Sequence, residues 1–305
     1  MSQSIQFTVE ETIKKNRLDR FLFGRVTTVS KMYLRNLIDR GACSINGEIE
    51  PAGYHLKKDD VIEINIDSAA VTAMKPESLP VEIVFEDEEI IVVNKSAQML
   101  VHPTLGQKSG TLLNALVYYL NQEKLDSARE TAKQNQPSFI RPGLIHRLDK
   151  QTSGLMVVAK TPGALSFLSN HFQRKLVKKR YFAVVEKIVA DESGTINEPI
   201  GRNDEEKRWS VKADGKSAET NYRVLERFSD KTLLELEPVT GRTNQLRIHC
   251  AYIGHWIIGD DKYGGAEFSR LCLHAAKLSF YHPTTNIWTE FESKIPIEFT
   301  RLMEN

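Results

Sequence analysis

Cysteine is scarce in this chain, and long apolar runs are absent from it. The 305 residues include only Cys43, Cys250 and Cys272, which form no C-x-x-C pair. A disulfide framework and a cysteine-based zinc site are therefore not expected, and three reduced thiols are typical of a cytoplasmic protein. No stretch approaches the ~20 apolar residues that span a bilayer, and the first residues lack the pattern of a signal peptide. We expect a cytoplasmic protein with no membrane partner.

An excess of charge of one sign is also missing. The chain has 41 basic and 40 acidic side chains, which give a formal net charge of +1. A uniformly basic coat for nucleic acid is excluded, so any such surface must come from local clustering of charge. Because domains usually have ~100–200 residues, the length favours one large domain and one small one.

Basic residues do cluster near the N-terminus. Residues 12–40 hold eight basic side chains against two acidic ones, whereas residues 41–67 hold two against six. Apolar spacing predicts a helix around Leu18 and another over residues 33–38, with Ser30 as its N-cap and Gly41 at its end. On charge alone, an ordinary solvated helix face is a better explanation of this cluster than RNA binding.

Strand signals follow this basic stretch. Residues 43–49 predict a hairpin around Asn46-Gly47, and residues 61–66 alternate as a further strand. Residues 68–80 are small and polar and contain two prolines, so we expect a linker there. A small α+β domain over residues 1–67 and a large domain over residues 81–305 are the predicted organisation.

The large domain mixes strands with a few helices. Helical periodicity occurs at residues 111–120 and 162–175, and residues 121–138 predict a polar loop. The two element types do not alternate regularly, which argues against a doubly wound parallel sheet. The predicted fold class is α+β, with a mixed, largely antiparallel sheet and flanking helices. Strands are expected at residues 81–85, 90–93, 155–159, 181–185, 220–225 and 233–236.

One acidic residue stands at the edge of a long basic interval. Between Asp149 and Glu186 there is no other acidic residue, but there are seven basic ones. Basic surroundings favour the carboxylate form of an aspartate, and a positive surface attracts phosphate. On these grounds alone, a structural role for Asp149 in a turn before Thr152 is equally plausible.

Four segments carry motifs whose order is informative: residues 93–103, 146–154, 179–185, and 241–249 followed by 259–264. The most specific of them is the His-Arg-Leu-Asp segment with Thr-Ser-Gly behind it. In order and spacing the four segments resemble the RluA-type pseudouridine synthases, enzymes that act mainly on large-subunit ribosomal RNA. The resemblance extends from about residue 81 to the end.

The region before residue 68 resembles the alpha-L RNA-binding domain. The resemblance rests on Arg17-Leu-Asp-Arg20 at its start and on Asn46-Gly47 near its end. It implies contacts with RNA phosphates, which give affinity but little sequence information. The candidate RNA-binding residues are Arg17, Arg20, Lys31 and Arg35.

The family resemblance implies a reaction and roles for three residues. Pseudouridine formation breaks the bond between sugar and uracil, rotates the base and reattaches it through carbon 5. Asp149 matches the essential aspartate, which either attacks the sugar or removes a sugar proton; both routes stay open. Arg242 matches the arginine that pairs with this carboxylate. Tyr181 matches a tyrosine that stacks on the uracil and is a candidate for removing the proton from carbon 5.

The resemblance also implies how the uridine is reached. The base must leave its stack; Arg147 matches an arginine that fills the vacated space, and Leu273 an apolar residue near the base. No cofactor, nucleotide or metal is implied, and the histidines lack the short paired spacing of a metal site.

Three positions depart from the family pattern. Ser96 and Trp256 stand where prolines are common, and Asn244 stands where histidine is common. The last difference puts in doubt fine positioning near Arg242 but not the class of reaction.

Alternatives to a ribosomal RNA pseudouridine synthase remain. One is an enzyme of the same kind that acts on transfer RNA, and another is a non-catalytic RNA-binding or ribosome-assembly factor. Asp149, Tyr181 and Arg242 argue against the non-catalytic factor. A metal-dependent nuclease would need a carboxylate cluster, and Asp260-Asp261 instead predicts a turn. The sequence identifies neither the modified uridines nor the oligomeric state.

Overall fold

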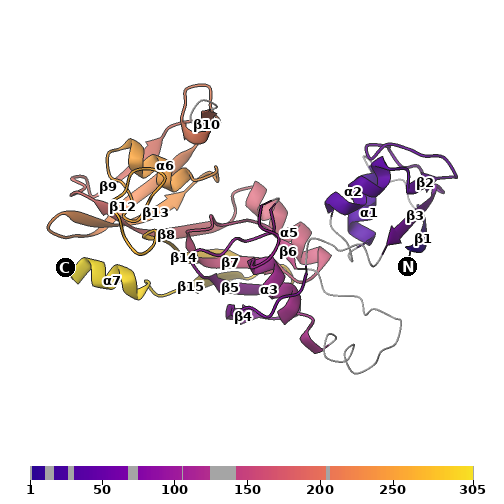
Figure 1. Ribbon diagram of the computed structural model, residues 1–305, viewed down its shortest axis with the longest axis horizontal. Helices are drawn as coiled ribbons and strands as arrows, with labels where there is room; N and C mark the ends of the chain where they lie inside the picture. Colours follow the sequence, from indigo (N-terminus) through magenta and orange to yellow (C-terminus); the bar gives the residue numbers. More distant parts are fainter. Residues whose placement is uncertain are drawn as a thin grey trace. The chain divides into compact units, whose positions relative to one another are not determined.

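The computed structural model describes residues 2–10, 17–26, 31–67, 75–104, 106–123, 142–203 and 207–304. The chain divides into two compact units (Figure 1). The first unit comprises Met1–Leu79 and His102–Pro142, and the second comprises Pro80–Val101 and Gly143–Asn305. The domain boundaries drawn from the sequence remain a prediction. None of the described helices is long and apolar enough to cross a membrane.

The N-terminal part of the first unit is a three-stranded antiparallel sheet with two helices. The strand order is β1-β3-β2. Leu18 and Leu22 of α1 pack with Leu34 and Ile38 of α2 in one buried cluster, as their helical spacing predicts. The elements are β1 (Ser2–Thr8), α1 (Leu18–Arg25), α2 (Lys31–Asp39), β2 (Cys43–Ile45) and β3 (Val61–Asp67); α3 (Leu112–Tyr119) also belongs to this unit.

The predicted hairpin at residues 43–49 is only partly correct. Asn46 and Gly47 adopt left-handed φ angles of 53° and 87°, as a tight turn requires. Beyond the turn, however, Glu48 forms a single bridge with Ile45, and β2 pairs along its length with β3 instead. α2 ends at Asp39, and Gly41, two residues later, has a φ of 73°, as expected for a glycine that follows a helix end. The predicted cap Ser30 lies outside the described residues.

A ten-stranded sheet forms the body of the second unit. Its order is β4-β5-β7-β14-β8-β13-β12-β9, with β15 on β14 and β6 on β7, and only the β7–β14 pairing is parallel. The predicted mixed, largely antiparallel fold is confirmed. The strands are β4 (Glu82–Glu86), β5 (Ile90–Lys95), β6 (Gly143–Leu144), β7 (Ser153–Ala159), β8 (Lys178–Glu186), β9 (Ser193–Asn197), β12 (Glu219–Arg227), β13 (Lys231–Pro238), β14 (Leu273–Tyr281) and β15 (Trp288–Glu292).

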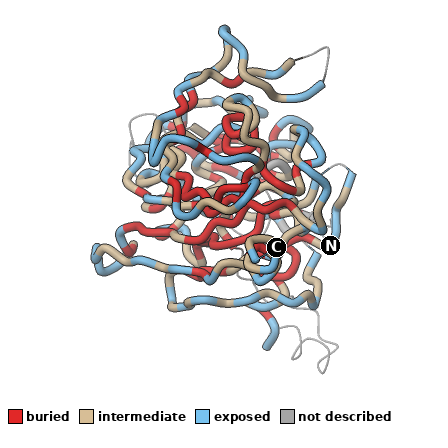
Figure 2. The backbone as a smooth tube through the Cα atoms, turned by 90° about the vertical axis from the view of Figure 1, so that its left-hand side faces the viewer, coloured by how far each residue is buried: buried red, intermediate tan, exposed pale blue. Residues whose placement is uncertain are grey.

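Helices and a small hairpin complete the second unit. Ala164 and Leu168 of α5 pack on Val157 of β7, and every residue of β7 is buried. Figure 2 shows buried backbone running through the interior of the molecule. The helix begins where predicted, because Thr161 accepts a hydrogen bond from the amide of Ala164 and Pro162 occupies the first turn. The sequence did not predict β14 or α6. The remaining elements are α5 (Pro162–Gln173), α6 (Gln245–Tyr252), α7 (Ile297–Glu304), β10 (Ile200–Asn203) and β11 (Arg208–Val211).

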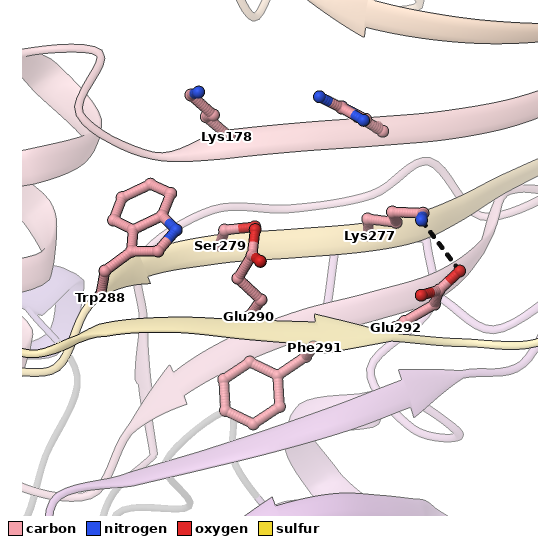
Figure 3. Close-up of a pocket in the computed structure, with 8 residues that line it drawn as sticks. Lys178, Lys277, Ser279, Trp288, Glu290, Phe291 and Glu292 are labelled. Atoms are coloured by element: carbon pink, nitrogen blue, oxygen red, sulfur yellow. Dashed lines mark hydrogen bonds and ion pairs between the residues drawn. The ribbon is translucent and has the colours of Figure 1, made fainter.

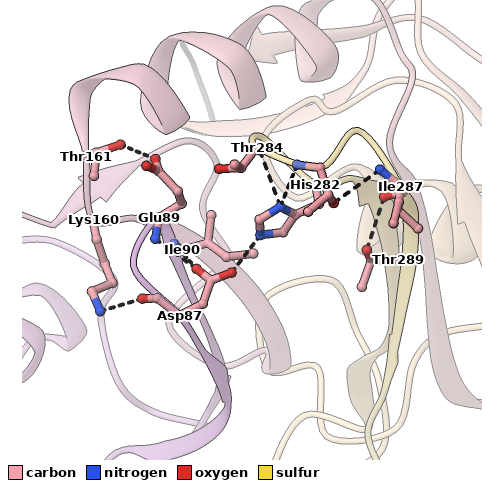
Figure 4. Close-up of polar contacts among 10 residues, drawn as sticks. Asp87, Glu89, Ile90, Lys160, Thr161, His282, Thr284, Ile287 and Thr289 are labelled. Carbon is pink, nitrogen blue, oxygen red and sulfur yellow. Dashed lines mark hydrogen bonds and ion pairs between the residues drawn. The ribbon is translucent and has the colours of Figure 1, made fainter.

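Polar contacts tie the turns at one end of this sheet together (Figure 4). Asp87, in the β4–β5 turn, accepts hydrogen bonds from the amides of Glu89 and Ile90 at 2.8 Å each. Its second oxygen lies 2.7 Å from Nε2 of His282, which follows β14. Although burial opposes them, these contacts lower the pKa of Asp87. The outer strand β4 is thereby anchored to the centre of the sheet.

Candidate active site

A cleft of about 840 Å³ crosses the middle of the large sheet. Its floor includes Tyr181 on β8 and Leu273 on the neighbouring strand β14. One wall comes from the last turns of α5, and the other from the segment that leads from β13 into α6. All five active-site residues expected from the sequence line this cleft: Arg147, Asp149, Tyr181, Arg242 and Leu273.

Asp149 is half-buried in the segment between β6 and β7. Burial raises its pKa, and the positive charges around it oppose that rise without cancelling it. We expected basic surroundings to favour the carboxylate, and they do, but desolvation is the larger effect. In order of strength, the opposing charges come from Arg247, Arg147, Lys262 and Lys95.

Arg247 is the cation that acts most strongly on Asp149, and the sequence analysis missed it. It projects from the first turn of α6 and is 4% exposed. Its guanidinium holds Asp260 with two bonds, Nε to Oδ2 at 2.8 Å and Nη2 to Oδ1 at 2.5 Å. Asp260 also accepts from the amides of Lys262 and Tyr263. The pair therefore fixes both the arginine and the turn that carries Lys262.

Arg242, the expected partner of Asp149, occupies a different place. Its side chain is exposed at the cleft, and Nε donates to the carbonyl oxygen of Ser217 at 2.9 Å. Among the described residues, it is not one of the cations that act on the pKa of Asp149. Arg247 lies five positions later in the same motif segment, in the first turn of the helix that starts at Gln245, and its charge acts on Asp149.

Asn244 also reaches the carboxylate. The surrounding donors and acceptors orient its side-chain amide so that Nδ2 donates to Oδ2 of Asp149 at 2.8 Å. A residue that the sequence analysis marked only as a departure from the family pattern is thus a direct contact of Asp149.

Lys95, at the end of β5, is 1% exposed. Its Nζ donates to the carbonyl oxygens of Ser96 at 2.7 Å, Met99 at 2.9 Å and Lys150 at 3.3 Å. Burial lowers its pKa to about 7, although the charge of Asp149 opposes this effect. The lysine ties the end of β5 to the residue next to Asp149.

Two uncharged groups complete the cleft near Asp149. Burial, together with the charge of Asp149, raises the pKa of Tyr181, so its phenol is protonated at neutral pH. The side chain of Thr152 is 2% exposed, and its hydroxyl has no hydrogen-bond partner among the described residues. Both residues line the cleft.

A second cavity, of about 310 Å³, is lined by β8, β14 and β15 (Figure 3). Two of its three cations have carboxylate partners: Lys277 lies 3.0 Å from Glu292, and Arg180 lies 3.7 Å from both Glu235 and Glu237. Since Lys178 and Glu290 also line the cavity, little net charge remains to attract a phosphate. Within the described ranges, no three His, Cys, Asp or Glu side chains are grouped to hold a metal ion.

Two of the four candidate RNA-binding residues, Arg17 and Arg35, share one carboxylate. Arg17 donates to both oxygens of Asp19, at 3.0 and 2.8 Å, and Arg35 lies 3.3 Å from the same side chain. Arg20 and Arg35 are exposed. The side chain of Lys31 lies outside what the structure describes. Asp19, which is buried, therefore organises a basic surface.

The chain is similar to known proteins over most of its length. A family model described as RNA pseudouridylate synthase matches residues 89–252. The uncharacterized RNA pseudouridine synthase YlyB of Bacillus subtilis (strain 168) is 36% identical, over 99% of this chain and 97% of its own. Ribosomal large subunit pseudouridine synthase D of Escherichia coli (strain K12) is 34% identical, over 100% and 95%. The structure of human RNA pseudouridylate synthase domain containing 1 superposes with a TM-score of 0.58 and 27% identity, over 72% of this chain and 86% of that one.

Proposed function

This chain belongs to the RluA-type family of RNA pseudouridine synthases, and we propose that it isomerises specific uridines of large-subunit ribosomal RNA with Asp149 as its catalytic carboxylate. As a member of this family it is an isomerase whose substrate is RNA. The single observation that carries the assignment of Asp149 is its position in the large cleft, among four cations and one amide donor.

The surroundings of Asp149 suit a carboxylate that must react while ionised. A half-buried carboxylate without partners would take up a proton. Arg247, held by Asp260, supplies a fixed positive charge, and Lys262 and Arg147 add to it. We assign to Arg247 the pairing role that the sequence suggested for Arg242. The arrangement serves an attack on the sugar as well as removal of a sugar proton.

Tyr181 and Leu273 form the surface on which the uracil would lie. They lie on the neighbouring strands β8 and β14, where Leu273 pairs with Ala183 and Tyr181 pairs with Ala275, and both line the cleft. Because burial raises the pKa of Tyr181, its phenol is neutral and can stack on the uracil. It can take the proton from carbon 5 only if its own hydroxyl proton passes to another acceptor in the same step. Arg147 is exposed beside Asp149, where it can fill the space that the flipped base leaves.

The substrate assignment rests on relatives and on charge. Several full-length relatives are named ribosomal large subunit pseudouridine synthase D. The exposed cations Arg20 and Arg35 of the N-terminal domain support additional contact with RNA phosphates. Arg242, exposed at the cleft, is suited to a phosphate near the target uridine.

The test compares the wild-type protein with Asp149→Ala on large-subunit ribosomal RNA that lacks pseudouridine. We expect the wild type to form pseudouridine at defined positions and the variant to lose at least ~10³-fold in rate. The dissociation constant for RNA should stay within about threefold, since phosphate contacts dominate affinity. Asp214→Ala, the same change at an exposed ion pair with Lys212, is the control and should retain full activity.

Each failure has a distinct meaning. Native rates in the Asp149 variant would refute the catalytic assignment. A wild-type protein that modifies transfer RNA but not ribosomal RNA would refute the substrate and leave the site intact. Binding of RNA without modification of either would favour the non-catalytic factor.

A further inference from the structure

Asn244 lies at the junction of the cleft wall and α6, in an unusual backbone conformation. It is the N-cap of α6, with φ 55° and ψ 22°. This left-handed region is unfavourable for most L-residues, and asparagine is among the few side chains that adopt it readily. The conformation directs the amide toward Asp149, away from the first amides of its own helix, to which it makes no capping bond.

The amide of Asn244 makes four contacts at once. Its Nδ2 donates to Oδ2 of Asp149 at 2.8 Å and to Oδ1 at 3.3 Å. Its Oδ1 accepts from Nζ of Lys262 at 3.3 Å and from the hydroxyl of Tyr263 at 3.0 Å. One uncharged side chain therefore joins the segment that carries Asp149 to the turn held by Asp260.

We propose that Asn244 is a positioning residue for catalysis: its amide sets the orientation of the Asp149 carboxylate and holds it in the ionised form. This inference rests on the proposed function, because it assumes that Asp149 reacts as a carboxylate. A hydrogen bond donated to a carboxylate favours the charged state, and an amide donates it at every pH at which the protein is folded. The cations around Asp149 lower its pKa through their charge. The amide of Asn244 contacts both carboxylate oxygens, so it also restricts rotation of the carboxylate.

The sign of the effect on pH dependence follows from the groups that face Asp149. These are Arg247 on α6, Arg147 in the same segment, Lys262 and Tyr263 in the 260–263 turn, Lys95 at the end of β5, and Tyr181 on β8. Burial already raises the pKa of Asp149. Removal of the amide takes away two donated contacts to the charged form, so the pKa must rise further. Activity should then disappear at a higher pH as the solution is acidified.

Asn244→Gly is the most informative variant. Glycine adopts a φ of 55° without strain, so this change removes the amide and leaves the backbone free to keep its conformation. Asn286→Gly is the matched control: Asn286 is exposed in the β14–β15 turn with φ 53°, outside the cleft. Asn244→His restores one donor and serves as the conservative replacement.

The experiment measures single-turnover rates on large-subunit ribosomal RNA from pH 5 to 9, together with RNA affinity and thermal unfolding. For Asn244→Gly we expect a ~10-fold lower rate at pH 7 and an acidic limb moved up by about one pH unit, with RNA affinity unchanged. Asn286→Gly should behave as wild type, and Asn244→His should recover part of the loss. A pH profile of Asn244→Gly that superposes on the wild-type profile would overturn the proposal, as would a loss uniform at all pH values that follows the fall in melting temperature.

A second readout needs no substrate. Titration of the ¹³C carboxyl resonance of Asp149 in the full-length protein should give a higher pKa in Asn244→Gly than in the wild type, and no change in Asn286→Gly. An unchanged Asp149 titration refutes the positioning role even if the enzyme proves to act on another RNA. A shifted titration in a protein that leaves ribosomal RNA unmodified supports the positioning role and refutes only the substrate assignment.

Discussion

At the scale of single residues, the cleft contains two ionisable side chains, Lys95 and Asp149, whose charged forms are destabilised by burial. Lys95 is fully buried and Asp149 half-buried, and burial shifts the pKa of each toward its neutral form. Each is retained by specific partners: three carbonyl oxygens for the lysine, and an amide and several cations for the aspartate. Such compensation is typical of sites in which the charged form takes part in function.

Thr152 lacks this compensation, which leads to a prediction about stability. Its buried hydroxyl has no hydrogen-bond partner in the described structure. Thr152→Val therefore removes a polar group that loses its contact with water on folding and forms no hydrogen bond in exchange. We expect the free energy of unfolding to rise by about 1 kcal/mol, measured by urea denaturation.

Thr232→Val provides the comparison for that measurement. The hydroxyl of Thr232 accepts from the amide of Val189 at 3.0 Å and donates to the carbonyl of Lys187 at 2.9 Å, so the same change there should destabilise by ~1–3 kcal/mol. If both variants lost stability equally, the hydroxyl of Thr152 would have to be satisfied in the folded protein.

At the scale of elements, the parallel contact between β7 and β14 places the segment that carries Asp149 against the floor of the cleft. Ser153 and Gly154 open β7 and pair with His274 and Ala275 on β14. Leu273, one residue earlier, lines the same cleft as Tyr181. The two strands approach closely at this point, because Gly154 has no side chain and a φ of 118°.

Gly154→Ala should disrupt this junction. A Cβ at position 154 would lie within 2.7 Å of the Cα of Ala275, and the positive φ adds strain. Because both backbones belong to the centre of the sheet, we expect a loss of about 3 kcal/mol or more in the free energy of unfolding. Chemical denaturation followed by circular dichroism measures it.

Gly163→Ala is the opposite case within the same fold. Gly163 lies in α5, where an added Cβ would meet Oγ1 of Thr161 at 3.8 Å and nothing closer, so alanine should be neutral or stabilise by ~0.5–1 kcal/mol. A similar loss for both glycines would contradict the close approach of β7 and β14 as the cause.

At the scale of the whole molecule, a nearly neutral chain presents local basic surfaces. The N-terminal domain shows this most clearly, since Arg20 and Arg35 are exposed while residues 41–67 are acidic. Residues 75–77 also hydrogen-bond within the first unit: the carbonyl of Lys75 accepts from Asn114, and Glu77 accepts from the amide of Gly110. Point substitutions therefore test the RNA-binding role of this domain better than a truncation near residue 75.

The double change Arg20→Ala with Arg35→Ala should weaken RNA binding and flatten its salt dependence. Each phosphate contact contributes ~0.7–0.9 to the slope of log K against log salt, so we expect the slope to fall by about 1.5. Lys57→Ala with Lys58→Ala removes the same charge from the acidic part of the domain and should change the slope much less. Equal slopes in both double variants would assign the effect to net charge alone.

The sequence alone determined the class of fold and of reaction. Period-two and helical spacing depend on neighbours along the chain, so β4, β5, β7, β8, β12, β13, α3 and α5 were predicted close to their observed bounds. The His-Arg-Leu-Asp segment and the three others in order were sufficient to identify the family. Asp149, Tyr181 and Leu273 were expected near one another, and they line one cleft.

Only the tertiary structure decided which side chains act on Asp149. The positions of Arg242 and Arg247 in the sequence do not indicate which of them acts on Asp149. In the structure Arg242 precedes α6, whereas Arg247 lies in its first turn. Asn244 could be noticed as unusual, but its left-handed backbone and its contact with Asp149 depend on segments about a hundred residues apart. The net direction of the Asp149 pKa was likewise undecidable from charge counts, because it depends on desolvation, and burial is a property of packing rather than of composition.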